Sequence, residues 1–335
     1  MAPKPSSDFR PPFWLKNSHA QNIFSSSGLR TRLLRKRFEK MVKSTEEHIL
    51  ELENDVRLLA KYSPQPRCEA CPTLSILHGW EGWSQSGYVQ SLAGLAYEQG
   101  YNIFRLNFRD HHDTHHFNKE IFNSSRIDEV VNALSLMQQE FPGTEHYLAG
   151  FSLGGNFAIR TAEKFSHPPL SAQQFKGVTA VCPVIDPKNS TDAVSDSLFI
   201  YEFYFTRKWK RSLGKKLEHF PEYDYQDELD TLKSMNELNQ HFIPNYTEFK
   251  TLEAYFKTYT ITPKLLENIS TPTTIIAAED DDMIPIGDVL DRKEQCKNSN
   301  VRFDIQRYGS HCAFLEDIDG SSWVDKRILS LFSKE

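Results

Sequence analysis

The sequence lacks several features that mark particular classes of protein. No apolar run approaches the roughly 18 residues of a membrane-spanning helix. The first residues contain no apolar signal core, so we expect a soluble protein that stays in the cytoplasm. The 39 Lys and Arg residues are outnumbered by 45 Asp and Glu, which gives a formal net charge of −6. Such a charge provides no overall positive field for binding nucleic acid.

Cysteine is also scarce, with only Cys68, Cys71, Cys182, Cys296 and Cys312 in 335 residues. An odd number of cysteines without a signal peptide predicts reduced thiols. Cys68 and Cys71 have C-x-x-C spacing, which leaves a metal or redox role as the alternative. However, no second pair completes a zinc site, and no helix pattern follows as a redox motif requires.

The composition that remains is that of a folded globular chain, with 39% hydrophobic and 25% charged residues. At this length we expect about two domains, or one α/β domain with an insertion.

Residues 47–62 alternate in polarity around Asn54 and Asp55, which predicts a β-hairpin. Further strands are expected at 73–77, 101–108, 145–149, 177–181, 273–277 and 301–305. Helices are expected at 88–98, 126–140, 156–164 and 322–332. The alternation predicts an α/β fold, with a mostly parallel central sheet and helices on both faces.

The strand rhythm breaks at Pro183, and residues 186–268 have a largely helical pattern that is rich in aromatic residues. An insertion of about eighty residues between consecutive core strands favours a helical cap. The core would then comprise residues 1–185 and 269–335. The aromatic residues are expected to form the cap's own core, or alternatively to line an apolar substrate pocket.

Residues 1–46 form a separate N-terminal segment that we expect to wrap over the core. Its first part, residues 1–28, is rich in Pro, Ser and aromatic residues, which predicts little regular structure. Residues 30–43 contain seven Lys and Arg against the single acid Glu39. We interpret this run as a solvated face, with a patch for anionic lipid or nucleic acid as the alternative.

Residues 149–155, AGFSLGG, contain a G-x-S-x-G motif between an expected strand and an expected helix. This context is typical of a nucleophile elbow, in which Ser152 stands clear of the backbone. Bulky side chains in place of Gly150 and Gly154 would clash with the neighbouring strand and helix. The N–H of Leu153, at the helix start, can donate to an oxyanion. The alternative is a glycine-rich turn with a serine that caps the helix.

A serine nucleophile needs a base to take its proton and an acid to orient that base. His311 is the only histidine after the expected cap, and it lies in a loop after an expected strand. Three consecutive aspartates follow the preceding strand. Their spacing to Pro285 favours Asp281 as the acid, with Asp280 as the alternative.

The loop at residues 78–82, HGWEG, follows the first expected parallel strand. Such a loop supplies the second oxyanion donor in this architecture, and we assign it to the N–H of Trp80. His78 is expected to be structural.

A histidine-rich loop follows the strand expected at 101–108. His111, His112, His115 and His116 could bind zinc or iron. Metal sites usually take ligands from more than one segment, and no second cluster is evident. We therefore expect these histidines to shape the mouth of the site or to form a hydrogen-bonded turn.

Together these motifs resemble the α/β-hydrolase superfamily, and more narrowly its YheT-like branch. The shared motifs lie at residues 10–21, 78–82, 150–156, 280–285 and 311–314. The resemblance implies a serine carboxylic-ester hydrolase whose acid is the second aspartate of a pair, here Asp281. Asp282 stands where the family often has proline. The histidine-rich loop replaces a usual R-G-x-x-G, which leaves the substrate class open.

We therefore expect an enzyme that cleaves carboxylic esters of short- to medium-chain acids through an acyl-enzyme intermediate. Ser152, His311 and Asp281 would be catalytic, and Leu153 and Trp80 would form the oxyanion hole. We expect no cofactor, no metal and no nucleic-acid partner. The expected partner is a small ester with an apolar acyl chain, and peripheral membrane contact stays open. The alternatives are a thioesterase or amidase with the same triad, or a non-catalytic binding protein of the same fold.

Overall fold

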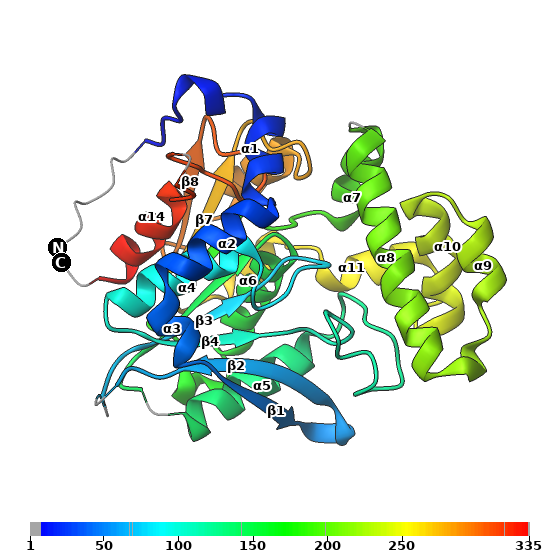
Figure 1. Ribbon diagram of the computed structural model, residues 1–335, viewed down its shortest axis with the longest axis horizontal. Coiled ribbons are helices and arrows are strands. Elements are labelled where there is room, and N and C mark those ends of the chain that lie inside the picture. Colours follow the sequence, from blue (N-terminus) through cyan, green and yellow to red (C-terminus); the bar gives the residue numbers. More distant parts are fainter. Residues whose placement is uncertain are drawn as a thin grey trace.

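The computed structural model describes residues 8–66, 68, 70–141, 143–197, 199–317 and 319–333. Eight of its strands form one sheet in the order β1-β2-β4-β3-β5-β6-β7-β8 (Figure 1). The strands are β1 Glu46–Glu51, β2 Arg57–Ser63, β3 Thr73–Leu77, β4 Asn102–Leu106, β5 His146–Phe151, β6 Gly177–Val181, β7 Thr273–Ala278 and β8 Val301–Gln306. β2 pairs antiparallel with β1 and with β4, and every other pairing is parallel. The predicted α/β fold with a mostly parallel sheet is confirmed.

The helices occupy most of the chain between and around these strands. The α-helices are α1 Ser18–Ser25, α2 Gly28–Arg37, α3 Glu39–Lys43, α4 Gly87–Glu98, α5 Ile127–Glu140, α6 Leu153–Lys164, α7 Pro187–Asp196, α8 Phe199–His219, α9 Gln226–Thr231, α10 Met235–Tyr246, α11 Leu252–Tyr259, α12 Pro263–Glu267, α13 Ile286–Gln295 and α14 Trp323–Phe332. The short 3₁₀ helices are η1 Phe13–Leu15, η2 Glu53–Asp55, η3 Leu170–Gln173 and η4 Pro221–Tyr223. Within the described part of the chain, none of these helices has the length and apolarity needed to cross a membrane.

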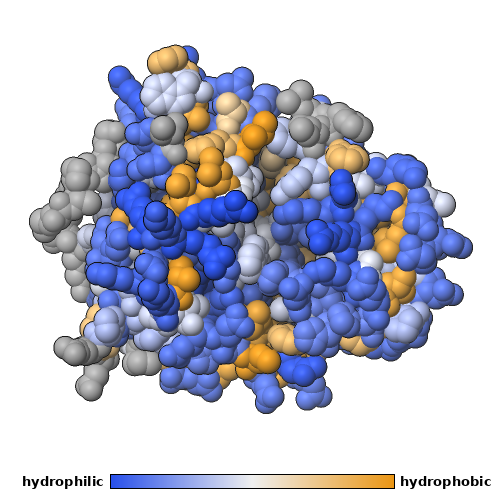
Figure 2. Space-filling model, viewed as in Figure 1, coloured by the Kyte–Doolittle hydropathy of each residue, from blue (hydrophilic) through white to orange (hydrophobic). Residues whose placement is uncertain are grey.

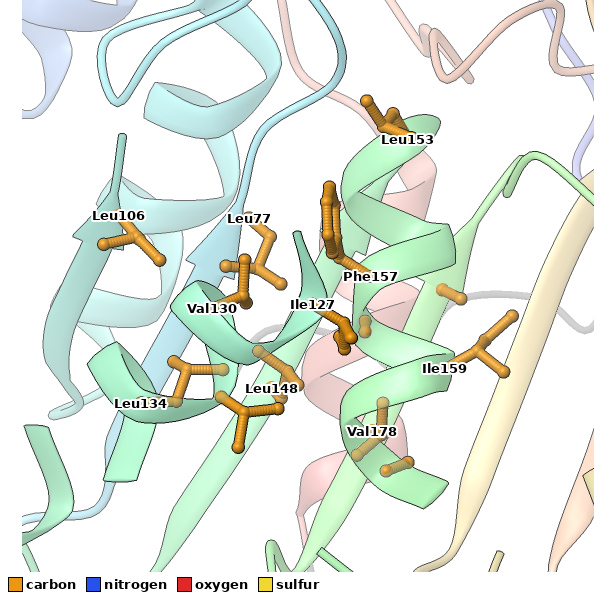
Figure 3. Packing of buried hydrophobic residues seen from close by; sticks show 14 of the residues in the cluster. Leu77, Leu106, Ile127, Val130, Leu134, Leu148, Leu153, Phe157, Ile159 and Val178 are labelled. Atoms are coloured by element: carbon orange, nitrogen blue, oxygen red, sulfur yellow. The ribbon is translucent and has the colours of Figure 1, made fainter. Parts of the chain in front are cut away.

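The core consists of two large apolar clusters that share the sheet. Successive residues of a strand point to opposite faces, so Leu148 of β5 belongs to one cluster while Tyr147 and Ala149 belong to the other. Helices α5 and α6 cover the first face, where Val130 and Phe157 pack towards the strands (Figure 3). Helices α2, α3, α4 and α14 cover the second face. The sheet is therefore enclosed on both sides, and β3, β4, β6 and β7 are buried along their whole length, as is typical of parallel strands.

The hairpin of β1 and β2 turns at the predicted residues. Asn54 and Asp55 both have a φ of 58°, a left-handed conformation that Asn and Asp adopt more readily than most residues. Glu51 consequently pairs with Arg57 at the end of the ladder.

Between β6 and β7 the chain forms α7 to α12 and η4, in agreement with the helical pattern of this region. In Figure 1, helices α7 to α10 lie to one side of the sheet. Helices α8, α9 and α10 share a third apolar cluster that includes Leu213, Tyr225, Leu229, Leu238 and Phe242. These helices therefore have a small core of their own, as expected for some of the aromatic residues.

The expectation of little regular structure in residues 1–28 is wrong for the part that the structure describes. Residues 18–25 form α1, because the Asn17 side chain accepts a hydrogen bond from the Ala20 N–H and so caps the helix. Helix α2 follows, with Ser27 as its cap. Leu34 and Phe38 are buried in the second core cluster, so this segment packs against the second face of the sheet. Residues 1–7 lie outside the described residues.

The prediction of reduced thiols is wrong for one pair of cysteines. Cys68 and Cys71 form a disulfide, and their Cα atoms, 5.7 Å apart, lie within the range that such a bond can span. The C-x-x-C motif therefore forms a disulfide within one loop. Cys182, Cys296 and Cys312 are free thiols.

Candidate active site

Ser152 lies in the turn between β5 and α6, in a backbone conformation that L-residues rarely adopt. Its φ is 54° and its ψ is −120°. A hydrogen bond from the Ser152 N–H to the Val181 carbonyl, 2.9 Å long, holds the turn against β6. A Cβ on Gly150 would lie 2.1 Å from the Gly154 carbonyl oxygen, and one on Gly154 would lie 2.4 Å from that of Leu77. The expected clash at both positions is therefore confirmed, and it explains why glycine flanks the serine.

Ser152, His311 and Asp281 form one hydrogen-bonded chain. Ser152 Oγ lies 2.9 Å from His311 Nε2, and His311 Nδ1 lies 2.9 Å from Asp281 Oδ2. Asp281 Oδ1 accepts hydrogen bonds from the N–H groups of Met283 and Ile284, at 2.8 and 3.0 Å. The turn that these bonds form orients the carboxylate towards the imidazole. The three side chains come from loops after β5, β7 and β8, at the carboxyl ends of parallel strands.

The two neighbouring aspartates make different contacts. Asp280 Oδ1 accepts a hydrogen bond from the Ser310 N–H at 2.8 Å, and burial raises the pKa of this carboxyl. Asp282 Oδ2 accepts a hydrogen bond from Ser18 Oγ at 2.8 Å and lies 3.2 Å from His19 Nδ1. The geometry therefore brings Asp281, and neither neighbour, to the imidazole of His311.

The electrostatic surroundings of His311 favour its protonated form. Burial acts to lower the pKa of the imidazole, but the negative charge of Asp281 and its hydrogen bond act in the opposite direction. The balance raises the pKa of His311 to about 9. A proton taken up by Nε2 is consequently stabilised at this position.

The two N–H groups expected to form the oxyanion hole belong to segments that adjoin the turn of Ser152. Leu153 is the first residue of α6, so its N–H has no acceptor within the helix. In the loop after β3, the N–H of Trp80 has no acceptor among the described residues, while that of Gly79 donates to Tyr88 Oη at 2.9 Å. A Cβ on Gly79 would lie 3.2 Å from that of Ser152, so this loop contacts the turn directly.

Two buried histidines support the same loop. His78 Nδ1 donates to the Gly79 carbonyl at 2.7 Å, and its Nε2 accepts from the Phe108 N–H at 3.1 Å. His111 Nε2 accepts from the Glu81 N–H at 3.1 Å. Burial lowers the pKa of both imidazoles, that of His111 to about 4, which keeps them neutral as these bonds require.

The other three histidines of the histidine-rich loop point to separate partners. His112 stacks on Trp83, and His115 Nε2 bonds to Ser212 Oγ at 2.8 Å. His116 packs against the ring of Phe117. In the described ranges, no group of three or more His, Cys, Asp or Glu side chains is arranged to hold a metal ion.

A cavity of about 560 Å³ lies over the serine. Ser152, His311, Leu153 and Trp80 lie on its wall together with aromatic side chains from α8 and α11. The principal aromatic residues are Tyr201, Tyr204, Phe205, Trp209, Tyr255 and Tyr259. Some aromatic residues of the inserted helices therefore line a largely apolar pocket, while others, such as Tyr225, form the small core beneath them.

Residues near the start of the chain also reach this site, and sequence reasoning missed them. Asn22 Oδ1 accepts a hydrogen bond from the His311 N–H at 3.1 Å, and Asn22 Nδ2 donates to Tyr201 Oη at 3.3 Å. Ser310 Oγ donates to the Ser18 carbonyl at 2.8 Å. A run of polar residues within an otherwise aromatic segment was the one sequence feature that could have drawn attention to Ser18 and Asn22. Nothing in that run indicates contact with residues near position 311.

Known proteins resemble this chain in sequence and in fold. A family model described as alpha/beta hydrolase fold matches residues 72–317. The putative esterase YheT of Escherichia coli is 24% identical over 312 residues, which cover 91% of this chain and 89% of that protein. An abhydrolase domain-containing protein of Dictyostelium discoideum is 23% identical over 335 residues, which cover 97% and 80%. The solved esterase Pf2001 of Pyrococcus furiosus has a TM-score of 0.57 at 15% identity and covers 83% of this chain and 86% of that one.

Proposed function

We propose that this chain, which belongs to the α/β-hydrolase superfamily in its YheT-like branch, is a serine hydrolase of carboxylic esters with short- to medium-chain acyl groups. The observation that carries the proposal is the hydrogen-bonded chain from Ser152 Oγ through His311 to the carboxylate of Asp281. This arrangement supplies a nucleophile, a base and an orienting acid, which is what acyl transfer by serine needs.

In the first half of the reaction, Ser152 Oγ attacks the acyl carbon while His311 Nε2 takes the hydroxyl proton. The carbonyl oxygen becomes an oxyanion, which accepts hydrogen bonds from the N–H groups of Leu153 and Trp80. As the ester C–O bond breaks, His311 gives its proton to the departing alkoxide. The alcohol leaves, and the acyl group remains bound to Ser152.

In the second half, water attacks the acyl-enzyme and His311 takes the proton of that water. The bond to Ser152 Oγ breaks, His311 returns the proton to it, and the carboxylic acid is released. Throughout, Asp281 holds the Nδ1 proton, which leaves Nε2 free to act on the serine or on water. The raised pKa of His311 reflects the stabilisation of the imidazolium that both halves require.

Residues 186–268 would act as a cap over a core of residues 1–185 and 269–335, with residues 1–46 wrapped over that core. The proposal is supported by the aromatic side chains that α8 and α11 contribute to the cavity wall, of which Phe205, Trp209 and Tyr259 are examples. An apolar wall distinguishes acyl chains by about 1–3 kcal/mol per methylene. We therefore expect a graded chain-length preference.

Hydrolysis of p-nitrophenyl esters with acyl chains of increasing length tests the proposal directly. The variant Ser152→Ala should lose roughly a millionfold in kcat, as removal of a triad serine does elsewhere. A wild-type chain that is inactive on every ester, or a variant that retains full activity, would refute the serine mechanism. Matched thioester and amide substrates separate the proposed reaction from other acyl transfers on the same triad.

A further inference from the structure

Large apolar side chains are concentrated on the surface of the N-terminal helices. Among the described residues, nine large hydrophobic side chains are exposed, and five of them lie between positions 13 and 33. Ile23 on α1 is 62% exposed, and Leu29 and Leu33 on α2 are 62% and 41% exposed. Leu29 and Leu33 are four residues apart, so they lie side by side on the outer face of α2. Exposed apolar side chains that gather in this way mark an interaction surface.

Cations flank these leucines on the same helix. Arg32 and Lys36 occupy the positions three and seven residues after Leu29, which places them next to the leucines on the outer face. Within the part of the chain that the structure describes, no ion pair involves Arg32, Arg35, Lys36 or Lys40. Arg30, by contrast, is buried and donates to the Gly320 and Ser25 carbonyls. We call Ile23, Leu29, Arg32, Leu33 and Lys36 the N-terminal face.

The N-terminal face borders the cavity that contains Ser152. Ile23 and Thr31, from α1 and α2, line the cavity on one side, and Tyr204 of α8 lines it on the other. Figure 2 shows hydrophobic atoms gathered over the α1 and α2 region, beside a hollow that separates them from α7 and α8. A partner bound to the N-terminal face would therefore lie next to the cavity.

We propose that the N-terminal face docks on an anionic lipid bilayer, with Leu29, Leu33 and Ile23 entering the interface and Arg32 and Lys36 contacting lipid headgroups. Helix α2 carries Arg32, Arg35, Lys36 and Arg37 beside the exposed leucines, and such a cluster of cations on a helix attracts the headgroups of anionic lipids. The patch is positive although the whole chain has a net charge of −6, so the attraction is local. The residues substituted in the test, Leu29, Arg32, Leu33 and Lys36, do not line the cavity, so docking can be tested separately from the proposed chemistry.

Two other occupants fit the N-terminal face less well. A second copy of the chain, bound through the same patch, would bring Arg32 and Lys36 against their own counterparts, and like charges repel. Nucleic acid would neutralise the cations but would leave Leu29 and Leu33 without an apolar partner. An anionic bilayer offers phosphate groups to the cations and an apolar interior to the leucines.

Sedimentation of the full chain with vesicles of ether-linked phosphatidylcholine, with and without ether-linked phosphatidylglycerol, tests the proposal. Ether lipids contain no carboxylic ester, so the outcome does not depend on hydrolysis by the proposed reaction. We expect binding to the vesicles that contain phosphatidylglycerol, and weaker binding as NaCl screens the charges. Each cation near such a surface contributes roughly fivefold to partitioning, so Arg32→Gln with Lys36→Gln should weaken binding roughly 25-fold. Leu29→Ser with Leu33→Ser should weaken it about tenfold or more.

Matched controls lie on α13, which does not line the cavity. Leu290→Ser and Lys293→Gln remove an exposed apolar side chain and an exposed cation there, and binding should not change. Urea midpoints equal to that of the wild type would show that all variants fold. The proposal is overturned if vesicles with phosphatidylglycerol do not sediment the chain, or if the α13 variants lose as much binding. It is also overturned if the cation variants lose only DNA binding, or if the leucine variants abolish only self-association.

Discussion

Asn22 and His311 are 289 positions apart in the chain, yet the Asn22 side chain accepts a hydrogen bond from the His311 backbone N–H at 3.1 Å. The same Asn22 amide donates to Tyr201 Oη. Helix α1, the loop of His311 and helix α8 therefore meet at one side chain. The hydrogen bond of Asn22 reaches the backbone N–H of His311 and not its imidazole, so we regard Asn22 as a positioning residue for the imidazole.

Replacing Asn22 by leucine should lower kcat about ten- to a hundredfold, because a small displacement of the base costs much of the catalytic rate. The Michaelis constant should change little. Asn22→Asp retains an acceptor for the His311 N–H, so it serves as the matched control and should retain more activity. Steady-state kinetics on a p-nitrophenyl ester measures both constants. A kcat of Asn22→Leu within twofold of the wild type would contradict the positioning role.

Exchange of Asp281 for asparagine should lower kcat by about 10⁴, because the wrong imidazole tautomer is then favoured. The pH profile should change as well. The base acts as neutral imidazole, and Asp281 helps to raise the pKa of His311 to about 9. The acidic limb of kcat/KM in the wild type should therefore lie above pH 6.5, and Asp281→Asn should move it to lower pH.

Asp280→Asn is the control for that experiment, since the amide oxygen can still accept from the Ser310 N–H. We expect activity within a few fold of the wild type and an unchanged acidic limb. If Asp280→Asn proved the more damaging of the two variants, the acid would have to be reassigned.

The tight turn at Ser152 should make Gly154→Ala destabilising. A Cβ there would lie 2.4 Å from the carbonyl oxygens of Leu77 and His78, so the backbone must move. Overpacking of this kind costs about 1–3 kcal/mol in the free energy of unfolding. Urea denaturation followed by circular dichroism measures the loss.

Gly214→Ala is the matched substitution at a position where nothing lies within 4 Å of the new Cβ. Gly214 is inside α8, and alanine is favoured over glycine in a helix by about 1 kcal/mol. This variant should therefore be slightly more stable than the wild type. Equal effects of both alanines would show that the close approach at Gly154 is not what requires glycine.

Phe205 provides a test of the acyl pocket. It lines the cavity and stacks on Trp80 with 5.7 Å between ring centroids. Phe205→Ala removes an apolar side chain from the cavity wall, so kcat/KM should fall more for long acyl chains than for short ones. The difference should correspond to about 1–3 kcal/mol of transition-state binding. Phe203, on the same helix, is 51% exposed and does not line the cavity. Phe203→Ala should leave the ratio of long- to short-chain activity unchanged, and an equal shift in both variants would argue against a pocket at Phe205.

The sequence by itself determined the order of the elements and the turn at Ser152, because these depend on local patterns. Strands such as β3 are short runs rich in apolar residues, the hairpin turn needs residues that tolerate positive φ, and G-x-S-x-G is confined to one turn. Asp281 and His311 could be selected because the fold's topology places the loops after β7 and β8 at the same edge of the sheet as Ser152. Choosing between Asp280 and Asp281 from sequence depended on spacing alone.

Only the tertiary structure decided which distant side chains meet. The hydrogen bond of Asn22 to His311 and the position of the cavity between α1, α2, α8 and α11 have no local signature. Helix α1 was missed because its buried face consists of Gln21, Asn22 and Ser25, whose polarity conceals an amphipathic pattern. Such contacts arise from the packing of segments far apart in the chain, and packing depends on three-dimensional shape and burial, which periodicity does not record.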